Sequence, residues 1–596
     1  MTTYTAPIAD FKFVLNDLLG MDKYSNLPGF EEVSPDLVDA ILEEAGKVAS
    51  EVLHPINYSG DQEGCQWNDG VVTTPKGFKE AYDLYVESGW GSLTAKTEHG
   101  GQGLPQTLAI MVSEMMIAAN WGFTMYPGLT KSAVEAIDAH ASDELKQKYL
   151  PNMVAGKWTG TMNLTEPHCG TDLGLIRTKA EAQADGSYRI SGTKIFISAG
   201  EHDLSENIIH LVLAKIPGGP AGTKGISLFL VPKFLVNGDG SVGARNGVAC
   251  GSIEHKMGIH SNATCVMNYD GATGWLVGEV NKGMSAMFTM MNEARLWVGI
   301  QGLGIAEVAY QNAAHYARDR LQGRAISGAK NADGPADPII VHPDVRRMLM
   351  TGKAFTEGAR AMAAIAGLQV DLLHRHPDEK VRQKADDYVA LMTPVIKAYF
   401  TDMGVEVASL AVQTYGGHGY IQENGVEQFL RDARIAPIYE GTNGVQAMDL
   451  VGRKLAMNGG RAIQAFFAEV GQFVKDAREN EALAAMAGEL EKALGRLQQA
   501  TMWLMQNGLA KPDNAGAASS DYLRLMALVA MGHVWGLMAQ TAAAKLADGA
   551  GNEAFYEHKL ITARFFFERM LPDTGSLLKK IESGSESLMA LPADAF

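Results

Sequence analysis

The stretch that decides the fold is SYRISGTKIFI, residues 187–197, a short run rich in Ile, Phe and Tyr. Two more apolar runs of this kind follow at residues 208–213 and 225–231. Asp185-Gly186 precedes the first run and Gly218-Gly219 separates the last two, and such pairs are typical of turns between strands. The composition and the turn signals together predict a middle region of short β-strands.

Helical patterns lie on both sides of this β region, with apolar residues recurring three and four positions apart. They fall at residues 35–160, 284–320, 344–374, 380–415 and 460–596, with a loop rich in Gly, Asp and Pro at 323–338 and a linker-like break at 511–520. Single strands do not alternate with single helices, which disfavours a doubly wound dinucleotide fold. The order predicts an α+β protein with four parts, a helical part at 1–160, a β part at 161–283, a second helical part at 284–459 and an extra helical part at 460–596.

The composition excludes several classes of protein. Among 596 residues, Lys and Arg number 51 against 68 Asp and Glu, a net charge of −17, so no nucleic-acid partner is expected. The four cysteines form no CxxC pair and the first residues lack the apolar core of a signal peptide, which favours a cytoplasmic location. The apolar run at 525–539 is shorter than the roughly 20 residues of a membrane-spanning helix. It is predicted to be a buried helix and not a membrane span.

Familiar motifs of metal and nucleotide sites do not occur in the sequence. There is no HExxH, GxSxG or GxxxxGK[ST] string, and the histidines lack ligand partners at zinc-like spacing, so no metal site is expected. Gly299, Gly302 and Gly304 lie inside a helical pattern, which favours close helix packing over a dinucleotide loop. Gly416-Gly417-His418-Gly419 follows a helical pattern, where a plain helix end is a sufficient explanation.

One string carries a candidate catalytic group: RDARIAPIYEGTN at residues 431–443. Pro437 should end the preceding structure, so Glu440 falls in a turn beside Ile438 and Tyr439. A carboxylate held among apolar and aromatic groups loses hydration, its pKa rises, and it becomes a better base. The alternative is that Glu440 only caps a helix that begins near Asn443.

Three motifs resemble those of the acyl-CoA dehydrogenases. MNLTEPHCGTD at 162–172 resembles their flavin-binding signature, YEGT at 439–442 their catalytic-base motif, and EHGGQG at 98–103 a glycine turn of their first domain. The spacings from Arg295 to Arg320 and from Gln413 to Glu440 are also similar to the family's. The resemblance implies an N-terminal helical domain, a middle β-barrel or sandwich domain and a C-terminal four-helix bundle, here followed by an extra helical domain.

The resemblance also implies FAD as the cofactor and gives roles to individual residues. Glu440 would be the catalytic base. Arg295, Tyr439 and Gly441 would contact the substrate. The positions that would bind FAD are Leu164, Thr165, Gly170, Thr171, Phe196, Ser198, Arg320, Gln413, Gly416, Gly417 and Thr442, with Arg320, Gln413, Gly416 and Gly417 reaching FAD across a dimer interface. Phe196 stands where many members have Trp, so stacking on the flavin would lose area and an indole donor.

The activity that the resemblance implies is α,β-dehydrogenation of an acyl-CoA to a trans-2-enoyl-CoA, with electrons passing to electron-transferring flavoprotein. The chain length is similar to that of a long bacterial branch of the family. This implies 3-methylthiopropanoyl-CoA, an intermediate of dimethylsulfoniopropionate demethylation, as the substrate, and a homodimer or a dimer of dimers. The alternatives are a broad-range fatty acyl-CoA dehydrogenase of β-oxidation, an acyl-CoA oxidase, or a helical interaction protein without catalysis.

Overall fold

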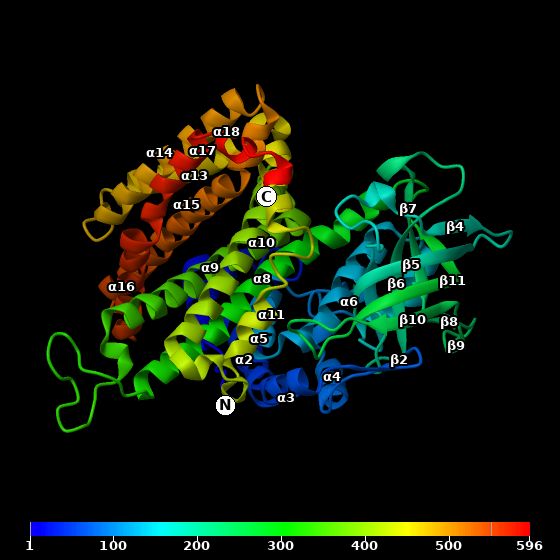
Figure 1. Ribbon diagram of the computed structural model, residues 1–596, viewed down its shortest axis with the longest axis horizontal. Helices are drawn as coiled ribbons and strands as arrows, with labels where there is room; N and C mark the ends of the chain where they lie inside the picture. The colour runs from blue at the N-terminus through cyan, green and yellow to red at the C-terminus, as the bar shows by residue number, and fades with distance from the viewer. Residues whose placement is uncertain (1, 550) are drawn as a thin grey trace. The chain divides into compact units, whose positions relative to one another are not determined.

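The computed structural model describes residues 2–549 and 551–596, and many of its helices and strands are labelled in Figure 1. The chain divides into two compact units. The β unit comprises Lys47–Pro105 and Ala119–Trp297, and the helical unit comprises Met1–Gly46, Gln106–Ala118 and Val298–Phe596. Each unit therefore gathers segments that are far apart in the sequence.

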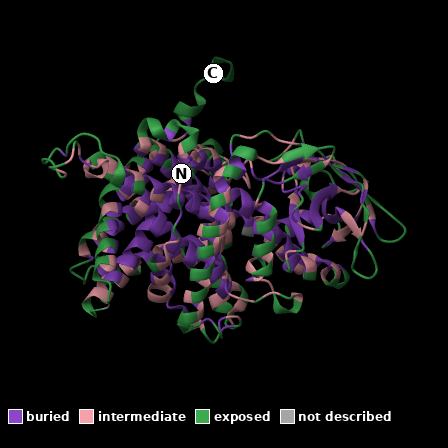
Figure 2. Ribbon diagram, turned by 90° about the horizontal axis from the view of Figure 1, so that it is seen from below, coloured by how far each residue is buried: buried purple, intermediate pink, exposed green. Residues whose placement is uncertain are grey.

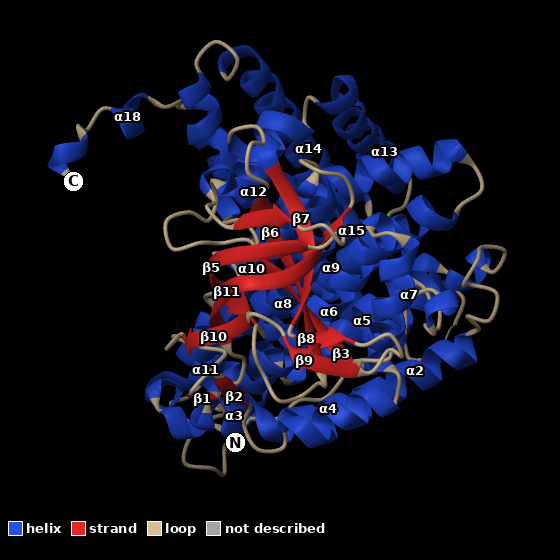
Figure 3. Cartoon of the chain, turned by 90° about the vertical axis from the view of Figure 1, so that its right-hand side faces the viewer, coloured by secondary structure: helices blue, strands red, loops and turns tan. Residues whose placement is uncertain are grey.

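The centre of the β unit is a seven-stranded sheet in the order β10-β11-β5-β4-β6-β3, and β7 pairs with both β11 and β6 (Figure 3). Its strands are β3 (Trp158–Asn163), β4 (Lys179–Ala182), β5 (Tyr188–Ser198), β6 (Asn207–Lys215), β7 (Ile226–Pro232), β10 (Val248–Ile253) and β11 (Thr264–Val277). Two small hairpins pair β1 (Gln66–Asn68) with β2 (Val71–Thr73) and β8 (Phe234–Val236) with β9 (Val242–Arg245). The predicted strands at 187–197, 208–213 and 225–231 are confirmed as β5, β6 and β7.

Helices of the β unit cover β3, the strand that leads into the flavin-like motif. The α-helices are α3 (Asn57–Glu63), α4 (Phe78–Glu87), α6 (Trp121–His140) and α7 (Asp143–Val154). The backbone N–H of Gly160 in β3 donates to Thr130 Oγ1 in α6 at 3.0 Å. A Cβ at Gly160 would lie 2.6 Å from that of Ala133, so glycine allows the helix to pack closely on the strand. This packing fixes β3 against α6.

Three of the long helices of the helical unit follow the β region in the sequence: α8 (Gly283–Asp319), of which the part after Trp297 belongs here, α9 (Pro343–Arg375) and α10 (Glu379–Tyr415). They confirm the helices expected at 284–320, 344–374 and 380–415. A Cβ on Gly302 of α8 would lie 2.4 Å from the carbonyl oxygen of Phe400 in α10, and one on Gly304 would lie 2.8 Å from Ile117. The glycines of α8 therefore serve close helix packing, as the sequence predicts.

The remaining α-helices of this unit complete its core. They are α1 (Ile8–Lys12), α2 (Pro35–Lys47), α5 (Gln106–Ala119), α11 (Val426–Ala433), α12 (Asn443–Asp449), α13 (Arg461–Ala477), α14 (Ala484–Asn507), α15 (Pro512–Ala547), α16 (Glu553–Arg569), α17 (Thr574–Glu582) and α18 (Glu586–Met589). By length and composition α15 could cross a membrane, but 89% of its most apolar window is buried inside the protein, as the purple ribbon of the unit's interior illustrates (Figure 2). The buried helix expected at 525–539 is confirmed.

The linker-like break expected at 511–520 is wrong. Helix α14 ends at Asn507 and α15 already begins at Pro512, so only a short turn separates them. Proline is tolerated in the first turn of a helix because the N–H that it lacks would have no intrahelical partner there. The polar residues after Pro512 belong to the first turns of α15, and Ser519 among them is buried.

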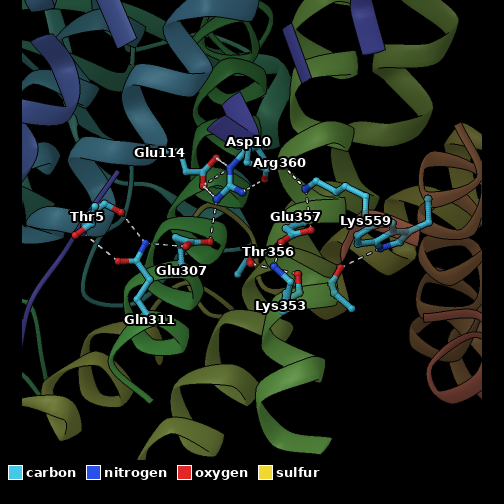
Figure 4. A network of polar contacts seen from close by, with 12 residues as sticks. Thr5, Asp10, Glu114, Glu307, Gln311, Lys353, Thr356, Glu357, Arg360 and Lys559 are labelled. Atoms are coloured by element: carbon cyan, nitrogen blue, oxygen red, sulfur yellow. Dashed lines mark hydrogen bonds and ion pairs between the residues drawn. The ribbon is translucent and has the colours of Figure 1, made fainter. Parts of the chain in front are cut away.

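A buried ionic cluster joins five helices of the helical unit (Figure 4). The Arg360 cluster is defined here as Asp10 (α1), Glu114 (α5), Glu307 (α8), Glu357 and Arg360 (α9) and Lys559 (α16). The Arg360 guanidinium contacts Asp10 and Glu114 and lies 2.8 Å from Glu307, while Lys559 contacts Asp10 and lies 2.7 Å from Glu357. Lys559, in one of the extra C-terminal helices, thus compensates the charge of Asp10 in the first helix of the chain.

We expect this cluster to make stability depend on pH. Burial raises the pKa of Glu114 to about 7, although Arg360 opposes the shift. The folded protein holds the proton on the Glu114 carboxyl more tightly than the unfolded chain does. The stabilisation that this proton provides is therefore complete below about pH 4.5 and is lost as the pH rises through about 7. Thermal unfolding between pH 5.5 and 8 should show wild-type stability falling by about 1–3 kcal/mol. The Glu114→Gln variant should lose much of this dependence, and equal slopes for the two proteins would contradict the assignment.

Candidate active site

The flavin-like motif forms a loop in the β unit, residues 164–171, called the signature loop here. Lys194 of β5 is fully buried, and its ammonium donates to the Leu164 carbonyl oxygen and to Glu166 Oε1, each at 2.9 Å. The backbone N–H of Ile195 donates to the Thr165 carbonyl oxygen at 2.9 Å. Strand β5 therefore holds the first half of the signature loop by both main-chain and side-chain bonds.

Glu166 is the buried anchor of the signature loop. Its carboxylate accepts from the backbone N–H of Arg177 at 2.7 Å and from that of Thr178 at 3.0 Å, besides the bond from Lys194. Burial alone would raise the pKa of Glu166, but the Lys194 ammonium and these hydrogen bonds hold it below its ordinary value. Sequence reasoning missed both anchors. The sequence features that could have identified Glu166 and Lys194 are an acidic residue inside the motif and a lysine inside a predicted strand.

The signature loop and the end of β5 present the groups expected for flavin binding. Phe196 has a left-handed backbone (φ 58°) and its residue is 59% exposed, at an irregularity in the pairing of β5 with β11. Ser198 is half-buried two residues later, and Thr165 is half-buried in the loop. Gly170 and Thr171 are exposed at the far end of the loop. An outward aromatic ring beside hydroxyls and backbone amides suits a planar ring with polar edges, so these residues fit a flavin.

We expect Lys194→Met to release FAD from a protein that still folds. The variant keeps most of the side-chain volume but removes the donor to the Leu164 carbonyl and the ammonium that pairs with Glu166 Oε1, and a buried carboxylate without its counter-charge is costly. Flavin content after gel filtration should fall severalfold. The control is Lys179→Met on the neighbouring strand β4, where the lysine is exposed. Full flavin content in Lys194→Met would show that the loop does not need this anchor.

The candidate base lies in the helical unit, in a segment that follows α11 and ends on the first residue of α12; residues 436–443 are called the base loop. Glu440 is half-buried and has a left-handed backbone (φ 54°), as does Gly441 (φ 79°). Thr442 is the N-cap of α12, and its Oγ1 accepts from the Val445 N–H at 3.2 Å. The alternative that Glu440 only caps this helix is therefore wrong, because Thr442 does so.

Neighbouring side chains hold the base loop. The Tyr439 hydroxyl hydrogen-bonds Gln301 of α8. Gln446 of α12 is buried, and its Nε2 donates to the Glu440 carbonyl oxygen at 3.1 Å. Gln301 and Gln446 were not identified from the sequence, where a glutamine in a helical pattern carries no distinct signal.

A third set of predicted residues gathers where α8 and α10 end. Arg320 directly follows α8 and is exposed, and Gln413 with Gly416-Gly417 lies at the end of α10, also exposed. The Tyr316 and Tyr415 rings stack with centroids 4.1 Å apart, and the Tyr316 hydroxyl lies 2.7 Å from His418 Nδ1. These contacts bring the two helix ends together. Gly416 (φ 60°) does end the helix, and both an exposed guanidinium and exposed glycines suit phosphate oxygens.

Arg295, expected near the substrate, lies on α8 in the β unit and is only 8% exposed. Arg295 is therefore not an ordinary surface charge on a helix. The glycine turn at 98–103 is also as expected: Gly100 has φ 86°, and a Cβ on Gly101 would lie 2.1 Å from the Ala95 carbonyl oxygen.

The chain matches four domain families along its length. They are described as the N-terminal, middle and C-terminal domains of acyl-CoA dehydrogenase, at residues 39–157, 161–272 and 281–456, and as an acetyl-CoA dehydrogenase C-terminal-like domain at 466–592.

Similar proteins match over nearly the whole chain. The chain is 43% identical to 3-methylmercaptopropionyl-CoA dehydrogenase of Ruegeria pomeroyi, over 98% of this chain and 99% of that one. It is 35% identical to broad-specificity linear acyl-CoA dehydrogenase FadE5 of Mycobacterium tuberculosis, over the full length of both. It is also 34% identical to a butyryl-CoA dehydrogenase of Syntrophomonas wolfei, over 100% and 99%.

Solved structures share the fold. Caenorhabditis elegans ACDH-11 in complex with C11-CoA has a TM-score of 0.79 at 19% identity, covering 98% of this chain and 95% of that one. An acyl-CoA dehydrogenase of Bacillus anthracis complexed with FAD has a TM-score of 0.75 at 21% identity, covering 92% and 88%. Together with the domain matches and the 43% identity over nearly the whole length, these likenesses establish that the chain belongs to the acyl-CoA dehydrogenase family, in its long form with an extra C-terminal helical domain, and is a flavin-dependent oxidoreductase that uses FAD.

Proposed function

We propose that this acyl-CoA dehydrogenase oxidises 3-methylthiopropanoyl-CoA to 3-methylthioacryloyl-CoA, with Glu440 as the base. The substrate assignment rests on the 43% identity to the Ruegeria pomeroyi enzyme over 98% of the chain, against 34–35% for the butyryl-CoA and broad-specificity relatives. The 35% identity to the broad-specificity enzyme makes a range of linear acyl-CoA substrates the second candidate.

The observation that carries the role of Glu440 is its strained and well-held backbone. A left-handed conformation at a non-glycine residue costs of order 1 kcal/mol and persists only where the surroundings fix it. Such strain is concentrated at functional sites. Here the strain falls on the only carboxylate of the base loop, and Gln446 holds the carbonyl of the same residue.

The proposed chemistry divides between the chain and its cofactor. Bound FAD would supply the acceptor for the β-hydrogen and its electron pair. The Glu440 carboxylate takes the α-proton, and the electron pair of that C–H bond becomes the new α,β double bond, so a thioester and oxidised flavin give an enoyl thioester and reduced flavin. The half-buried position of Glu440 limits its hydration, which favours proton transfer to the carboxylate.

The other predicted residues take the following proposed roles. The signature loop with Phe196 and Ser198 holds the flavin ring, and Gly170 with Thr171 holds its diphosphate. Thr442 contacts FAD beside the base, while Arg295, Tyr439 and Gly441 contact the acyl-CoA. Arg320, Gln413, Gly416 and Gly417 bind FAD of a second subunit, which makes the enzyme a homodimer or a dimer of dimers. Electron-transferring flavoprotein is the proposed acceptor, and the cytoplasm the proposed location.

A substrate panel tests the assignment. Anaerobic flavin bleaching should be followed with 3-methylthiopropanoyl-, butanoyl-, octanoyl- and palmitoyl-CoA at several concentrations. We expect the first to give the highest kcat/KM by at least tenfold. Comparable values for octanoyl- or palmitoyl-CoA would support the broad-range candidate instead. Fast reoxidation of the bleached enzyme by air would replace the dehydrogenase assignment with an oxidase.

A further inference from the structure

A buried lysine sits under the base loop. Lys397, near the middle of α10, is 0% exposed. Its ammonium donates to the Ala436 carbonyl oxygen at 2.9 Å and to Asn443 Oδ1 at 2.8 Å. These two acceptors are the first and last residues of the base loop. One cation therefore binds both ends of the segment that carries Glu440.

The Asn443 side chain also connects the base loop directly to α10. Its Nδ2 donates to Thr401 Oγ1 at 3.0 Å and to the Ala398 carbonyl oxygen at 3.1 Å, both within one turn of Lys397. Its backbone N–H donates to the Pro437 carbonyl oxygen at 3.0 Å, which closes the base loop on itself. The Asn443 side chain is thus oriented by α10 on one side and by the loop on the other.

The remaining restraints act on the middle of the base loop from other helices. Tyr439 is held by Gln301 of α8, and the Glu440 carbonyl by Gln446 of α12. Among the residues that the structure describes, the two loop ends are joined through Lys397 and Asn443. A hydrogen bond from a charged donor is shorter and stronger than one between neutral groups, and here one ammonium makes two such bonds at once. Lys397 can therefore hold the loop in the strained form.

We propose that Lys397 is a positioning residue for the dehydrogenation, which holds the base loop so that the Glu440 carboxylate keeps one direction. The inference rests on the proposed role of Glu440 as the base. Lysine suits this task because its compact ammonium can bond a carbonyl and an amide oxygen from one point, whereas the planar arginine fork needs more room. Proton transfer from carbon is sensitive to placement, and a displacement of about 1 Å can cost roughly 100-fold in rate.

The test compares Lys397→Met with two lysine controls. Lys559→Met removes an equally buried lysine of the helical unit, from the Arg360 cluster, and Lys384→Met removes an exposed one from the same helix α10. For each holoenzyme the experiment measures flavin content, Tm, the dissociation constant of 3-methylthiopropanoyl-CoA and the limiting rate constant of flavin reduction. Hydrogen–deuterium exchange of residues 436–443 gives a readout that does not depend on activity.

We expect Lys397→Met to bind FAD normally and to change substrate affinity by less than threefold. Its limiting reduction rate should fall roughly 10- to 100-fold, with faster exchange in the base loop. Lys559→Met should lower Tm at least as much, yet keep the wild-type rate and base-loop exchange. Because removal of Lys397 could prevent folding, Asn443→Ala breaks the same link from the other side and should give the same pattern.

Two results would overturn the inference: a reduction rate within twofold of wild type in Lys397→Met or Asn443→Ala, or an equal rate loss in Lys559→Met. Glu440→Gln separates this failure from failure of the proposed function. If Glu440→Gln loses reduction while Lys397→Met keeps it, only the positioning role is wrong. If Glu440→Gln reduces its flavin at the wild-type rate, the base assignment is wrong and the inference fails with it.

Discussion

Replacing Glu440 with alanine is expected to leave FAD bound and to abolish reduction of the flavin by acyl-CoA. The variant removes the carboxylate proposed to accept the α-proton, and no other carboxylate lies within the base loop. General-base catalysis contributes about 10²- to 10⁴-fold, so the rate constant should fall by more than the lower limit. Anaerobic stopped-flow spectroscopy at the flavin absorbance band measures the rate constant of flavin reduction directly.

The matched control is Glu440→Gln, which preserves size and the left-handed backbone restraint but has no basic oxygen. It should be as slow as the alanine variant and should bind substrate more like the wild type. A carboxylate outside the base loop serves as a second control: Glu427 on α11 is half-buried and pairs with Arg431, and Glu427→Gln is not expected to change the rate. Reduction in Glu440→Ala at more than a tenth of the wild-type rate would rule out this residue as the base.

Arg360→Met should produce the largest loss of stability. It leaves Asp10, Glu114 and Glu307 buried without the guanidinium that contacts all three. Breaking a buried ion pair from one side typically costs about 3–5 kcal/mol, because an uncompensated charge remains. Thermal or urea unfolding should show a loss of this size.

A control on the same helix and a second-site change test the electrostatic cause. Arg347 is half-exposed and pairs with Asp344, so Arg347→Met should cost under about 1 kcal/mol. Adding Glu114→Gln to Arg360→Met should recover part of the stability, since it removes one uncompensated carboxylate. If the two arginine variants lose stability equally, or if the second change recovers nothing, the Arg360 cluster does not act as described.

The parts of the fold that follow from local patterns could be predicted from sequence. Strand β5 appears as SYRISGTKIFI, and the three long helices appear as apolar periodicity that ends near the observed residues. The position of Glu440 in a loop follows from Pro437 and Gly441. The prediction of a break at 511–520 is wrong because polar residues in the first turns of a helix are hard to distinguish from a linker.

The parts that depend on contacts between distant residues could not be predicted. Nothing local distinguishes Asp10 and Lys559, which meet although 549 positions separate them. Lys397 gave one signal, a single lysine within the apolar run PVIKAYF, but its partners lie beyond the next helix. The pairing of Glu166 with Lys194 likewise depends on the register of β5 beside the signature loop. Such residues support a site without belonging to its motif.

The most direct measurement of the central claim is a crystal structure of the Glu440→Gln holoenzyme with 3-methylthiopropanoyl-CoA bound. The account predicts that the side-chain amide of residue 440 lies about 3–3.5 Å from the α-carbon, with the flavin on the opposite face of the acyl chain. A side chain at residue 440 that points into solvent, with another group against the α-carbon, would contradict it.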